Sequence, residues 1–544
     1  AKHYFGVDAK SLTWPQAALL AGMVKNPTGY DPTDNPDAAI ARRATVFDRI
    51  VAAHYLTPAQ AAQYKESSLG LHVQTQRNGC LGSKAEFFCQ YVLNYLAADP
   101  AFGATEADRM RLLQTGGLTI RTTLDQRFQN AAQKAVNANV APTDQAVGAL
   151  AMVQPGTGNV KSLAQSRPMG TNRHKGQSYL NYLVPKEYGD ANGFQAGSTF
   201  KVFVLTTAIS RGFPMHQNIN SPPEKTFAQS SFQNCPGAGN YAGPPWEVHN
   251  STTSGQKNLY TGTRESVNTF YAQMEQKTGV CQPYALAKKM GVELTDPAHE
   301  RVPSFTLGIA DVSPLEMAGA YATFAARGKH CDNRPVTAVD GADGRRLKTY
   351  GVKCEQVMAP TIADAVSDVL HGVMSKQGFG SHLLLRVPAA AKTGTISGNK
   401  AVWFDGYTPA LATASVIAGA TYSGTQISLN GQRLRGRYIN DAAGSTVAGP
   451  MWADAMRTIA QWLPYRNFVK PPKSVVDGHG VAVPSVKGMS LAAAEKRLRA
   501  AGFRPVVGKR VKSRSKAGTV VGASPGGKVA KGTPITLTVS RGKR

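Results

Sequence analysis

A serine and a lysine three positions apart, Ser198 and Lys201, stand at the start of an apolar stretch. Residues i and i+3 share one face of a helix, so the hydroxyl and the amine would be neighbours. A serine hydroxyl attacks poorly until a base takes its proton, and a lysine can be that base only where burial or nearby cations keep it neutral. The apolar run from Val202 to Ile209 supplies such surroundings. The pair therefore predicts nucleophilic catalysis by Ser198 with Lys201 as its base.

The same spacing occurs twice more, at Ser254/Lys257 and at Ser513/Lys516. Both of these pairs lie in polar stretches rich in Gly or Lys, with nothing in the local sequence to bury the amine. We interpret them as solvated surface pairs. The motifs that follow Ser198 along the chain distinguish it from the other two serines.

Two further polar motifs follow the Ser198 segment. Ser266 and Asn268 offer a hydroxyl and a carboxamide two positions apart. The other motif places a cation and two hydroxyls around a glycine: Lys392, Thr393, Gly394 and Thr395. Ser-x-x-Lys, Ser-x-Asn and Lys-Thr-Gly, in this order, form the active-site set of penicillin-binding proteins and class A β-lactamases. With these motifs the chain resembles a class A penicillin-binding protein.

Other copies of the short motifs are interpreted as structural. Lys277-Thr278-Gly279 ends a helix-like run, where a glycine is expected as the C-terminal cap. Ser397-Gly398-Asn399 and Ser428-Leu429-Asn430 follow the Lys-Thr-Gly motif and have the composition of turns. A single choice of the three motifs keeps the order of the family.

The resemblance implies a role for each residue of the first two motifs. Ser198 would attack the carbonyl between two terminal D-alanines of a peptidoglycan stem peptide and form an acyl-enzyme, while Lys201 takes its proton. Ser266 would relay a proton to the departing D-alanine, and Asn268 would hold Lys201 and the substrate amide in register. An amine from a neighbouring stem would then take the acyl group, and β-lactams would be trapped at Ser198.

The third motif would bind the substrate. By the same resemblance, Lys392 fixes the carboxylate end of the substrate electrostatically, with the Thr393 and Thr395 hydroxyls as hydrogen-bond partners beside Gly394. The backbone N–H groups of Ser198 and Thr395 would hold the oxyanion, where one preset donor contributes about 3 to 4 kcal/mol. The resemblance implies neither a metal ion nor a cofactor.

The implied fold class is α+β, with a penicillin-binding or serine β-lactamase-like transpeptidase domain built on a central antiparallel sheet flanked by helices. Residues 401–409 and 411–420 read as paired strands directly after the Lys-Thr-Gly motif, and residues 447–462 read as a helix that closes the other face of the sheet. Residues 118–125, 126–138 and 147–153 read as strand, helix and strand.

The chain falls into five predicted parts. They are the C-terminal part of a glycosyltransferase domain (1–66), a connector (67–117), the transpeptidase domain (118–468), a linker (469–480) and one PASTA domain (481–541). Residues 1–66 resemble the end of the transferase domain of class A enzymes, through an Ala/Leu-rich helix, a Pro/Tyr/Asp turn and a helix with Arg42 and Arg43. The catalytic glutamates of that domain lie further upstream in the family. We therefore expect these residues not to polymerise glycan strands, although the full-length protein would do so.

Charge and hydropathy bear on location and partners. The 544 residues carry a net charge of +27, and residues 484–544 hold fifteen Lys or Arg and one acid, Glu495. This excess predicts contact with a polyanion, and because no nucleic-acid motif accompanies it, we expect a cell-wall or anionic membrane surface. The sequence has no run of about 18 apolar residues, so we expect the membrane anchor upstream of it, in an extracytoplasmic protein.

The six cysteines show no metal-ligand spacing: Cys80, Cys89, Cys235, Cys281, Cys331 and Cys354. An even number in a chain outside the cytoplasm permits three disulfides, and pairing between sequence neighbours is the simplest arrangement.

Three other functions fit parts of the pattern. A D,D-carboxypeptidase would pass the acyl group to water in place of an amine. A β-lactamase would need an additional base for deacylation, which no residue of the sequence evidently supplies, and would not need the transferase segment or the PASTA module. A non-enzymatic wall-binding scaffold would make the three motifs accidental. Two positions depart from the usual patterns: Ala196 stands where the family usually has Pro, and Val267 replaces the Asp of many β-lactamases.

Overall fold

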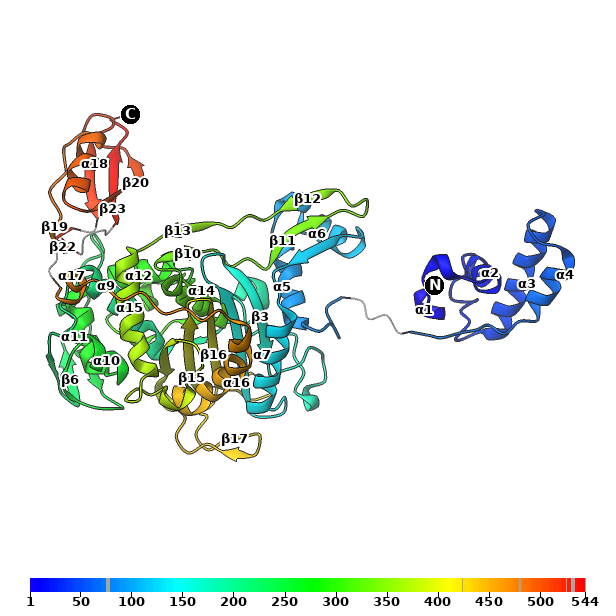
Figure 1. Cartoon of the computed structure of the whole chain (residues 1–544), viewed down its shortest axis with the longest axis horizontal. Helices are drawn as coiled ribbons and strands as arrows, with labels where there is room; N and C mark the ends of the chain where they lie inside the picture. Colours follow the sequence, from blue (N-terminus) through cyan, green and yellow to red (C-terminus); the bar gives the residue numbers. More distant parts are fainter. Residues whose placement is uncertain (75–78, 423, 479–480, 525, 530–533, 544) are drawn as a thin grey trace. The chain divides into compact units, whose positions relative to one another are not determined.

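A computed structural model of the chain describes all residues except 75–78, 423, 479–480, 525, 530–533 and 544 (Figure 1). The chain divides into two compact units, Ala1–Leu81 and Gly82–Arg544. None of the helices among the described residues is both long and apolar enough to span a membrane.

The first unit is helical. Thr13 and Gln16 form a capping box at the start of its second helix, and Pro36 opens the third, where its missing N–H is not needed. Arg43 of the third helix is fully buried and donates to the carbonyls of Ser67 and Ser68. The helices are α1 (Lys2–Phe5), α2 (Trp14–Met23), α3 (Pro36–Ala52) and α4 (Pro58–Lys65).

A five-stranded antiparallel sheet is the centre of the second unit, in the order β14-β15-β16-β2-β3. Its strands β15 and β16 are buried along their whole length, as expected for apolar runs covered by helices on both faces. This sheet confirms the predicted α+β class. The strands are β2 (Ala146–Gln154), β3 (Asn159–Gln165), β14 (Ala390–Thr395), β15 (Ala401–Thr408) and β16 (Leu411–Gly419).

Alternate residues of β15 face two different helical layers, because successive side chains of a strand point to opposite faces of the sheet. Phe404 packs on Trp452, on the face covered by α7 (Gln126–Asn139) and α16 (Gly449–Ile459). Tyr407 points the other way, toward Tyr321 of α14 (Pro314–Ala325), on the face that α9 (Lys201–Ser210) and α15 (Pro360–His371) complete. The predicted helix 447–462 thus corresponds to α16 and the short turns beside it.

The remaining helices of the second unit come from segments on both sides of the Ser198 region. α5 contacts α8 and β3, so part of the predicted connector packs on the second unit. The helices are α5 (Glu86–Ala97), α6 (Glu106–Thr115), α8 (Lys186–Gly189), α10 (Leu259–Arg264), α11 (Asn268–Thr278), α12 (Cys281–Lys289) and α13 (Pro297–Glu300).

Short strands form small sheets around this core. The strand predicted at residues 118–125 is β1 (Thr119–Thr122), and it pairs with β11 outside the central sheet. The other strands are β4 (Phe194–Gln195), β5 (Ile219–Ser221), β6 (Glu224–Phe227), β7 (Trp246–His249), β8 (Gly255–Lys257), β9 (Asp311–Val312), β10 (Lys329–Cys331), β11 (Val336–Asp340), β12 (Arg346–Thr349), β13 (Cys354–Gln356), β17 (Arg433–Leu434) and β18 (Arg437–Tyr438).

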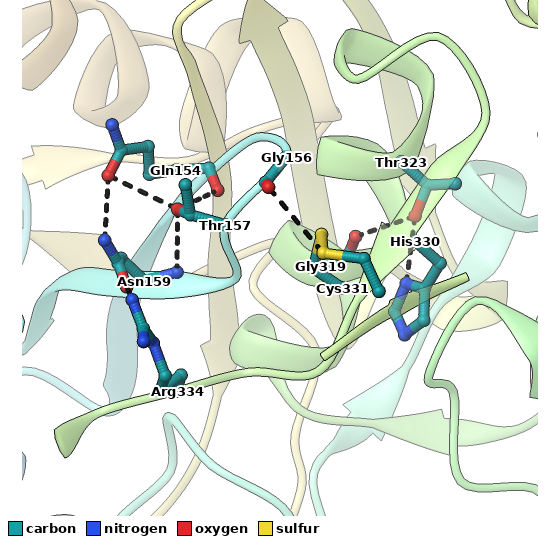
Figure 2. The surroundings of a disulfide bond; sticks show 10 residues. Gln154, Gly156, Thr157, Asn159, Gly319, Thr323, His330, Cys331 and Arg334 are labelled. Atoms are coloured by element: carbon teal, nitrogen blue, oxygen red, sulfur yellow. Dashed lines mark hydrogen bonds between the residues drawn. A yellow bond between two sulfur atoms is a disulfide. The ribbon is translucent and has the colours of Figure 1, made fainter. Parts of the chain in front are cut away.

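Disulfides join sequence neighbours, as predicted for Cys235–Cys281 and Cys331–Cys354. Cys80 and Cys89 are disulfide-bonded as well. The Cys331–Cys354 bond joins β10 to β13 at the turn between β2 and β3 (Figure 2). Beside this bond Arg334 donates to the Asn159 side chain at 3.0 Å. Because Asn159 begins β3, the contact ties the disulfide-bonded strands β10 and β13 to the edge of the sheet opposite β14.

The C-terminal part begins after a segment that packs on the sheet domain. Within the predicted linker 469–480, α17 (Lys473–Val476) contacts α15, and the Val476 carbonyl accepts from the Met215 N–H at 2.9 Å; residues 479–480 lie outside the described residues. The small module that follows has its own core around Leu498 and Leu537. Its elements are β19 (Val481–Ala482), α18 (Leu491–Ala500), β20 (Arg504–Val511), β21 (Val520–Ser524), β22 (Lys528–Val529) and β23 (Pro534–Ser540).

Candidate active site

Ser198 lies on a tight 3-10 turn, Gly197–Phe200, that leads directly into α9. A residue of another segment holds the turn in place: the Gly197 N–H donates to the Gly308 carbonyl at 2.9 Å. Gly197 has φ +59°, and a Cβ there would approach the Thr395 backbone to 3.0 Å, so a glycine fits best. The turn thereby brings the Ser198 backbone next to the third motif. The Ala196 that replaces the usual proline is fully buried in front of it.

Lys201 is fully buried at the first position of α9. Its ammonium donates to the Ser266 carbonyl and to Asn268 Oδ1, both at 2.7 Å, and lies 3.3 Å from Ser266 Oγ. Burial, and then the nearby Lys392 cation, hold the pKa of Lys201 well below its usual value. The environment that the sequence predicts for this amine is therefore present.

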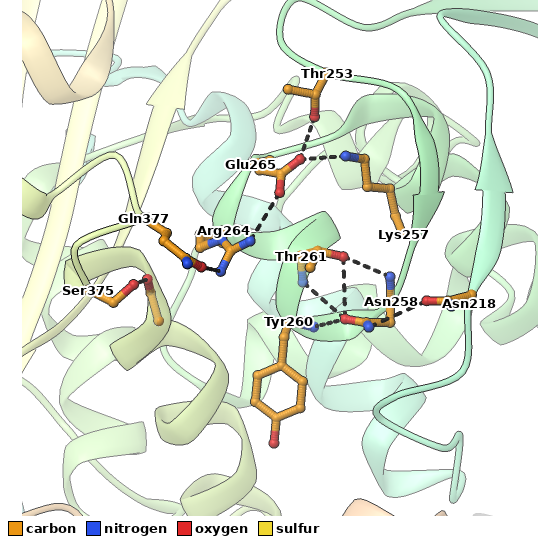
Figure 3. A network of polar contacts seen from close by, with 11 residues as sticks. Asn218, Thr253, Lys257, Asn258, Tyr260, Thr261, Arg264, Glu265, Ser375 and Gln377 are labelled. Atoms are coloured by element: carbon orange, nitrogen blue, oxygen red, sulfur yellow. Dashed lines mark hydrogen bonds and ion pairs between the residues drawn. The ribbon is translucent and has the colours of Figure 1, made fainter.

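Ser266 occupies the bend between α10 and α11, with φ +55°. The preceding residue, Glu265, anchors the bend: it accepts from Lys257 and from Thr253 at 2.5 Å each, and Arg264 contacts it at 3.3 Å (Figure 3).

The prediction of a solvated Ser254/Lys257 pair is wrong for the lysine. Lys257 is buried, because the chain beyond the local sequence brings Glu265 to it.

Asn268 is the first residue of α11. Its Nδ2 donates to the His249 carbonyl of β7 at 2.8 Å. Because one end of the carboxamide is fixed in this way, its oxygen is directed at Lys201. The second motif thus contributes two hydrogen-bond acceptors to one buried amine.

Lys392 approaches the same serine from β14. Its ammonium donates to Ser266 Oγ at 2.7 Å and to the Thr393 carbonyl at 2.9 Å. Burial lowers the pKa of Lys392 to about 7, and Asp405 acts in the opposite direction. The Ser266 hydroxyl therefore stands between two buried lysines, a position suited to relaying a proton.

The rest of the third motif lies along β14, which is an edge of the sheet. A Cβ on Gly394 would meet the Ala196 carbonyl at 2.8 Å, so this glycine lets the strand approach the Ser198 turn. Thr393 is buried, whereas Thr395 is exposed and its hydroxyl accepts from the Gly444 N–H at 3.4 Å. An exposed strand edge is a place where an extended peptide can add by main-chain pairing.

The motifs meet at a cavity of about 270 Å³. Among the residues that the structure describes, the Ser198 hydroxyl has no hydrogen-bond partner, so it is available to a ligand there. Lys201, Ser266 and Lys392 are buried and do not line the cavity. Its lining is Gln195, Ser198, Trp246, Asn268, Ser304, Leu307, Gly308, Ile309, Thr395, Ile396 and Ser397.

Several lining residues carry no signal in the sequence. Trp246 follows a Gly/Pro-rich stretch and reaches the site only because β7 pairs with β6. The segment with Leu307 and Ile309 reads as core, yet it forms the cavity wall because Gly308 touches the Ser198 turn. Their place in the cavity lining follows from tertiary contacts, so the sequence alone does not identify them.

Comparison with known protein families finds three matches. The model described as "Penicillin binding protein transpeptidase domain" matches residues 148–444, which include all three motifs. The PASTA domain model matches residues 481–541, and the transglycosylase model matches residues 1–51.

Curated relatives carry similar names. The chain is 27% identical over 514 residues to penicillin-binding protein 2D of Bacillus subtilis, covering 90% of the chain and 64% of the relative. It is 26% identical over 441 residues to penicillin-binding protein 1A of Clostridium acetobutylicum, covering 75% of the chain and 52% of the relative. The chain thus spans about half to two thirds of the length of these relatives.

Among solved structures, penicillin-binding protein 1A of Haemophilus influenzae shares the fold, with a TM-score of 0.65 at 17% identity over 87% of this chain and 84% of that one. The penicillin-binding protein PonA1 of Mycobacterium tuberculosis has a TM-score of 0.50 at 24% identity, covering 66% and 90%. Both likenesses concern the fold alone.

Proposed function

The chain belongs to the family of penicillin-binding proteins with a transpeptidase domain, and from this premise we propose that it is a serine D,D-transpeptidase that cross-links peptidoglycan stem peptides. It has the domains of a class A penicillin-binding protein, with part of a transglycosylase domain before the transpeptidase domain and one PASTA domain after it. The observation that carries the proposal is the position of Lys201, which is buried without a carboxylate hydrogen-bond partner, is held by Ser266 and Asn268, and begins α9 directly after the turn that carries Ser198.

Acylation follows from this arrangement. Ser198 Oγ attacks the carbonyl of the penultimate D-alanine, and its proton passes to Lys201, whose lowered pKa leaves the amine free to accept it. The C–N bond to the terminal D-alanine then breaks, and the leaving amine takes a proton through Ser266. An ester at Ser198 remains. The N–H groups of Ser198 and Thr395 would stabilise the oxyanion formed on the way.

The cavity lining favours a long-lived acyl-enzyme. No described residue that lines it carries a carboxylate, so the additional base that a β-lactamase needs for deacylation is not among the lining residues. An incoming amine needs less activation than water, which favours transfer to a second stem peptide. With a β-lactam the same step opens the ring, and the drug stays attached to Ser198.

The test is the intact mass of the chain after brief exposure to benzylpenicillin, beside a Ser198→Ala variant. We expect a stable adduct that the variant lacks. Rapid loss of the drug without an adduct would indicate a β-lactamase. Incubation of the acylating enzyme with a stem peptide then separates cross-linked dimers from the hydrolysed product of a D,D-carboxypeptidase.

The disulfides and the C-terminal charge support an extracytoplasmic location. Disulfides persist in oxidising compartments, and we place the full-length protein at the outer face of the cell membrane, with glycosyltransferase activity of its own. Among the described residues 481–541, eleven Lys or Arg are exposed, and we propose that they contact an anionic wall or membrane surface. Binding to anionic vesicles or to an anionic wall polymer that weakens steeply with salt would support this contact, and salt-independent binding would oppose it.

A further inference from the structure

Asp405 is a fully buried carboxyl that the mechanism above does not use. It lies on β15 directly opposite Lys392 of β14, and directly opposed residues of an antiparallel pair share one face of the sheet. Within the part of the chain that the structure describes, neither of its carboxyl oxygens accepts a hydrogen bond of good geometry and it forms no ion pair within 4.0 Å, although the Thr199 side chain and the Ser415 backbone lie close enough to favour its charged form. An unpaired acid is therefore buried one strand away from the active-site lysine.

The fold gives no reason for an acid at this position. The strand is otherwise apolar or small, with Trp403 and Tyr407 on the same face as Asp405. A buried carboxyl without a partner costs free energy, and an apolar residue of similar size would avoid that cost. The Lys392 ammonium does not neutralise it directly, because it turns toward Ser266 and Thr393.

The groups around Asp405 include one adjacent cation. Lys392 faces it from β14, Tyr321 from α14, and Tyr407 lies on its own strand. The two phenols stay neutral, since burial raises the pKa of each. Lys201 lies beyond, across the Ser266 hydroxyl that both lysines contact. The charge of the acid therefore acts first on Lys392, and through Lys392 on Lys201.

We infer that Asp405 is a positioning residue for acylation: its carboxyl keeps the proton on Lys392, and the charged Lys392 keeps Lys201 free to accept the proton of Ser198. This inference rests on the proposed transpeptidase function. Substrate binding needs a cation at Lys392, and nucleophile activation needs a neutral amine at Lys201. Both lysines contact Ser266, so their protonation states must be set separately. A single acid next to Lys392 does this.

The directions of the pKa shifts agree with this asymmetry. Burial lowers the pKa of Lys392, and Asp405 opposes the change; burial and the Lys392 charge both lower the pKa of Lys201. Burial raises the pKa of the Asp405 carboxyl well above its usual range, whereas the Ser415 backbone, the Lys392 charge and the Thr199 side chain favour its charged form, so acid and lysine titrate as a coupled pair.

The experiment is the pH dependence of Ser198 acylation by benzylpenicillin in the whole chain, for the wild type, Asp405→Asn and Asp405→Val. Thr413→Val is the matched control, because it removes another fully buried polar group from the neighbouring strand β16, beside Met456 and away from both lysines. We expect both Asp405 variants to move the alkaline limb of the profile to lower pH by about half a unit or more, which is about a threefold loss of rate on that limb. The control should keep the wild-type profile.

Melting temperatures separate this role from a structural one. Shifted profiles in both Asp405 variants, with unchanged or raised melting temperatures, would support the inference. Unshifted profiles, or a uniform loss of rate at every pH together with a lower melting temperature, would overturn it and leave the transpeptidase proposal intact. Absence of any Ser198 adduct in the wild type would overturn both.

Discussion

Lys201 of the transpeptidase domain and Lys516 of the C-terminal module both follow a serine by three residues, yet their surroundings are opposite. Lys201 is fully buried and held by two residues that come 65 and 67 positions later in the chain. Lys516 is exposed among other cations on a small module with a single acid. The spacing by three residues therefore permits a nucleophile and its base but does not create them. Lys201 can accept a proton because distant segments bury it and because its hydrogen-bond partners carry no negative charge.

Lys257, the third lysine with this spacing, lies between the two extremes. It is buried like Lys201, but Glu265 compensates its charge through a contact of 2.5 Å. Burial with a carboxylate partner makes this lysine a support for the Ser266 bend (Figure 3). The three sites therefore allow one comparison of burial with and without a neutralising acid.

The substitution Lys201→Arg should have the largest effect on the rate of acylation. Arginine stays protonated, so it cannot take the proton of Ser198, although it keeps the positive charge. We expect the rate of acylation by benzylpenicillin to fall by about 10²- to 10⁴-fold, the usual contribution of general base catalysis. A rate within a factor of a few of the wild type, in a protein that melts normally, would show that Lys201 is not the base.

The pH profile sharpens the contrast between the two buried lysines. Acylation should increase as pH rises through the lowered pKa of Lys201, because the neutral amine is the base, and should decrease as pH rises through about 7, because Lys392 loses its charge. Each limb should change the rate by about tenfold per pH unit far from the optimum. Stopped-flow acylation across pH checks this, and a profile that is flat around neutral pH would contradict the assigned protonation states.

Lys257→Met tests the intermediate case. The change leaves the partly buried Glu265 without its principal partner, so we expect unfolding free energy to fall by about 1.5 to 3 kcal/mol. Acylation should fall by less than about tenfold, since Lys257 supports the Ser266 bend and touches no reacting group. Denaturant unfolding and acylation rates check the two parts. A loss of acylation as large as that of Lys201→Arg would give Lys257 a direct role in the chemistry.

Lys516→Arg should have the smallest effect. The side chain is exposed, so the change should alter unfolding free energy by less than about 0.5 kcal/mol and leave acylation unchanged. The same two measurements on this variant provide the baseline for Lys201→Arg and Lys257→Met. A clear loss of acylation would mean that the C-terminal module takes part in the active site.

Much of the fold could be predicted because its signals are local. Apolar runs after the Lys-Thr-Gly motif predicted β15 and β16, and residues 447–462 predicted α16. The pairing of the central sheet could not be read in this way: β2 and β3 complete a sheet whose other strands lie more than 220 residues later. Strand order depends on which apolar faces find each other, and that is a property of the whole domain.

The same distinction between local signals and contacts of distant segments applies to the candidate site. The residue types could be read from the chain directly: a nucleophile, a base, a relay hydroxyl, a carboxamide and a cation, in an order that indicates one family. The folded domain was needed to show that Lys257 is buried beside Glu265, that Trp246 lines the cavity, and that Asp405 faces Lys392. The physical reason is that burial and charge neighbours set the protonation of a lysine, and both come from strand register and helix packing between segments far apart in the chain.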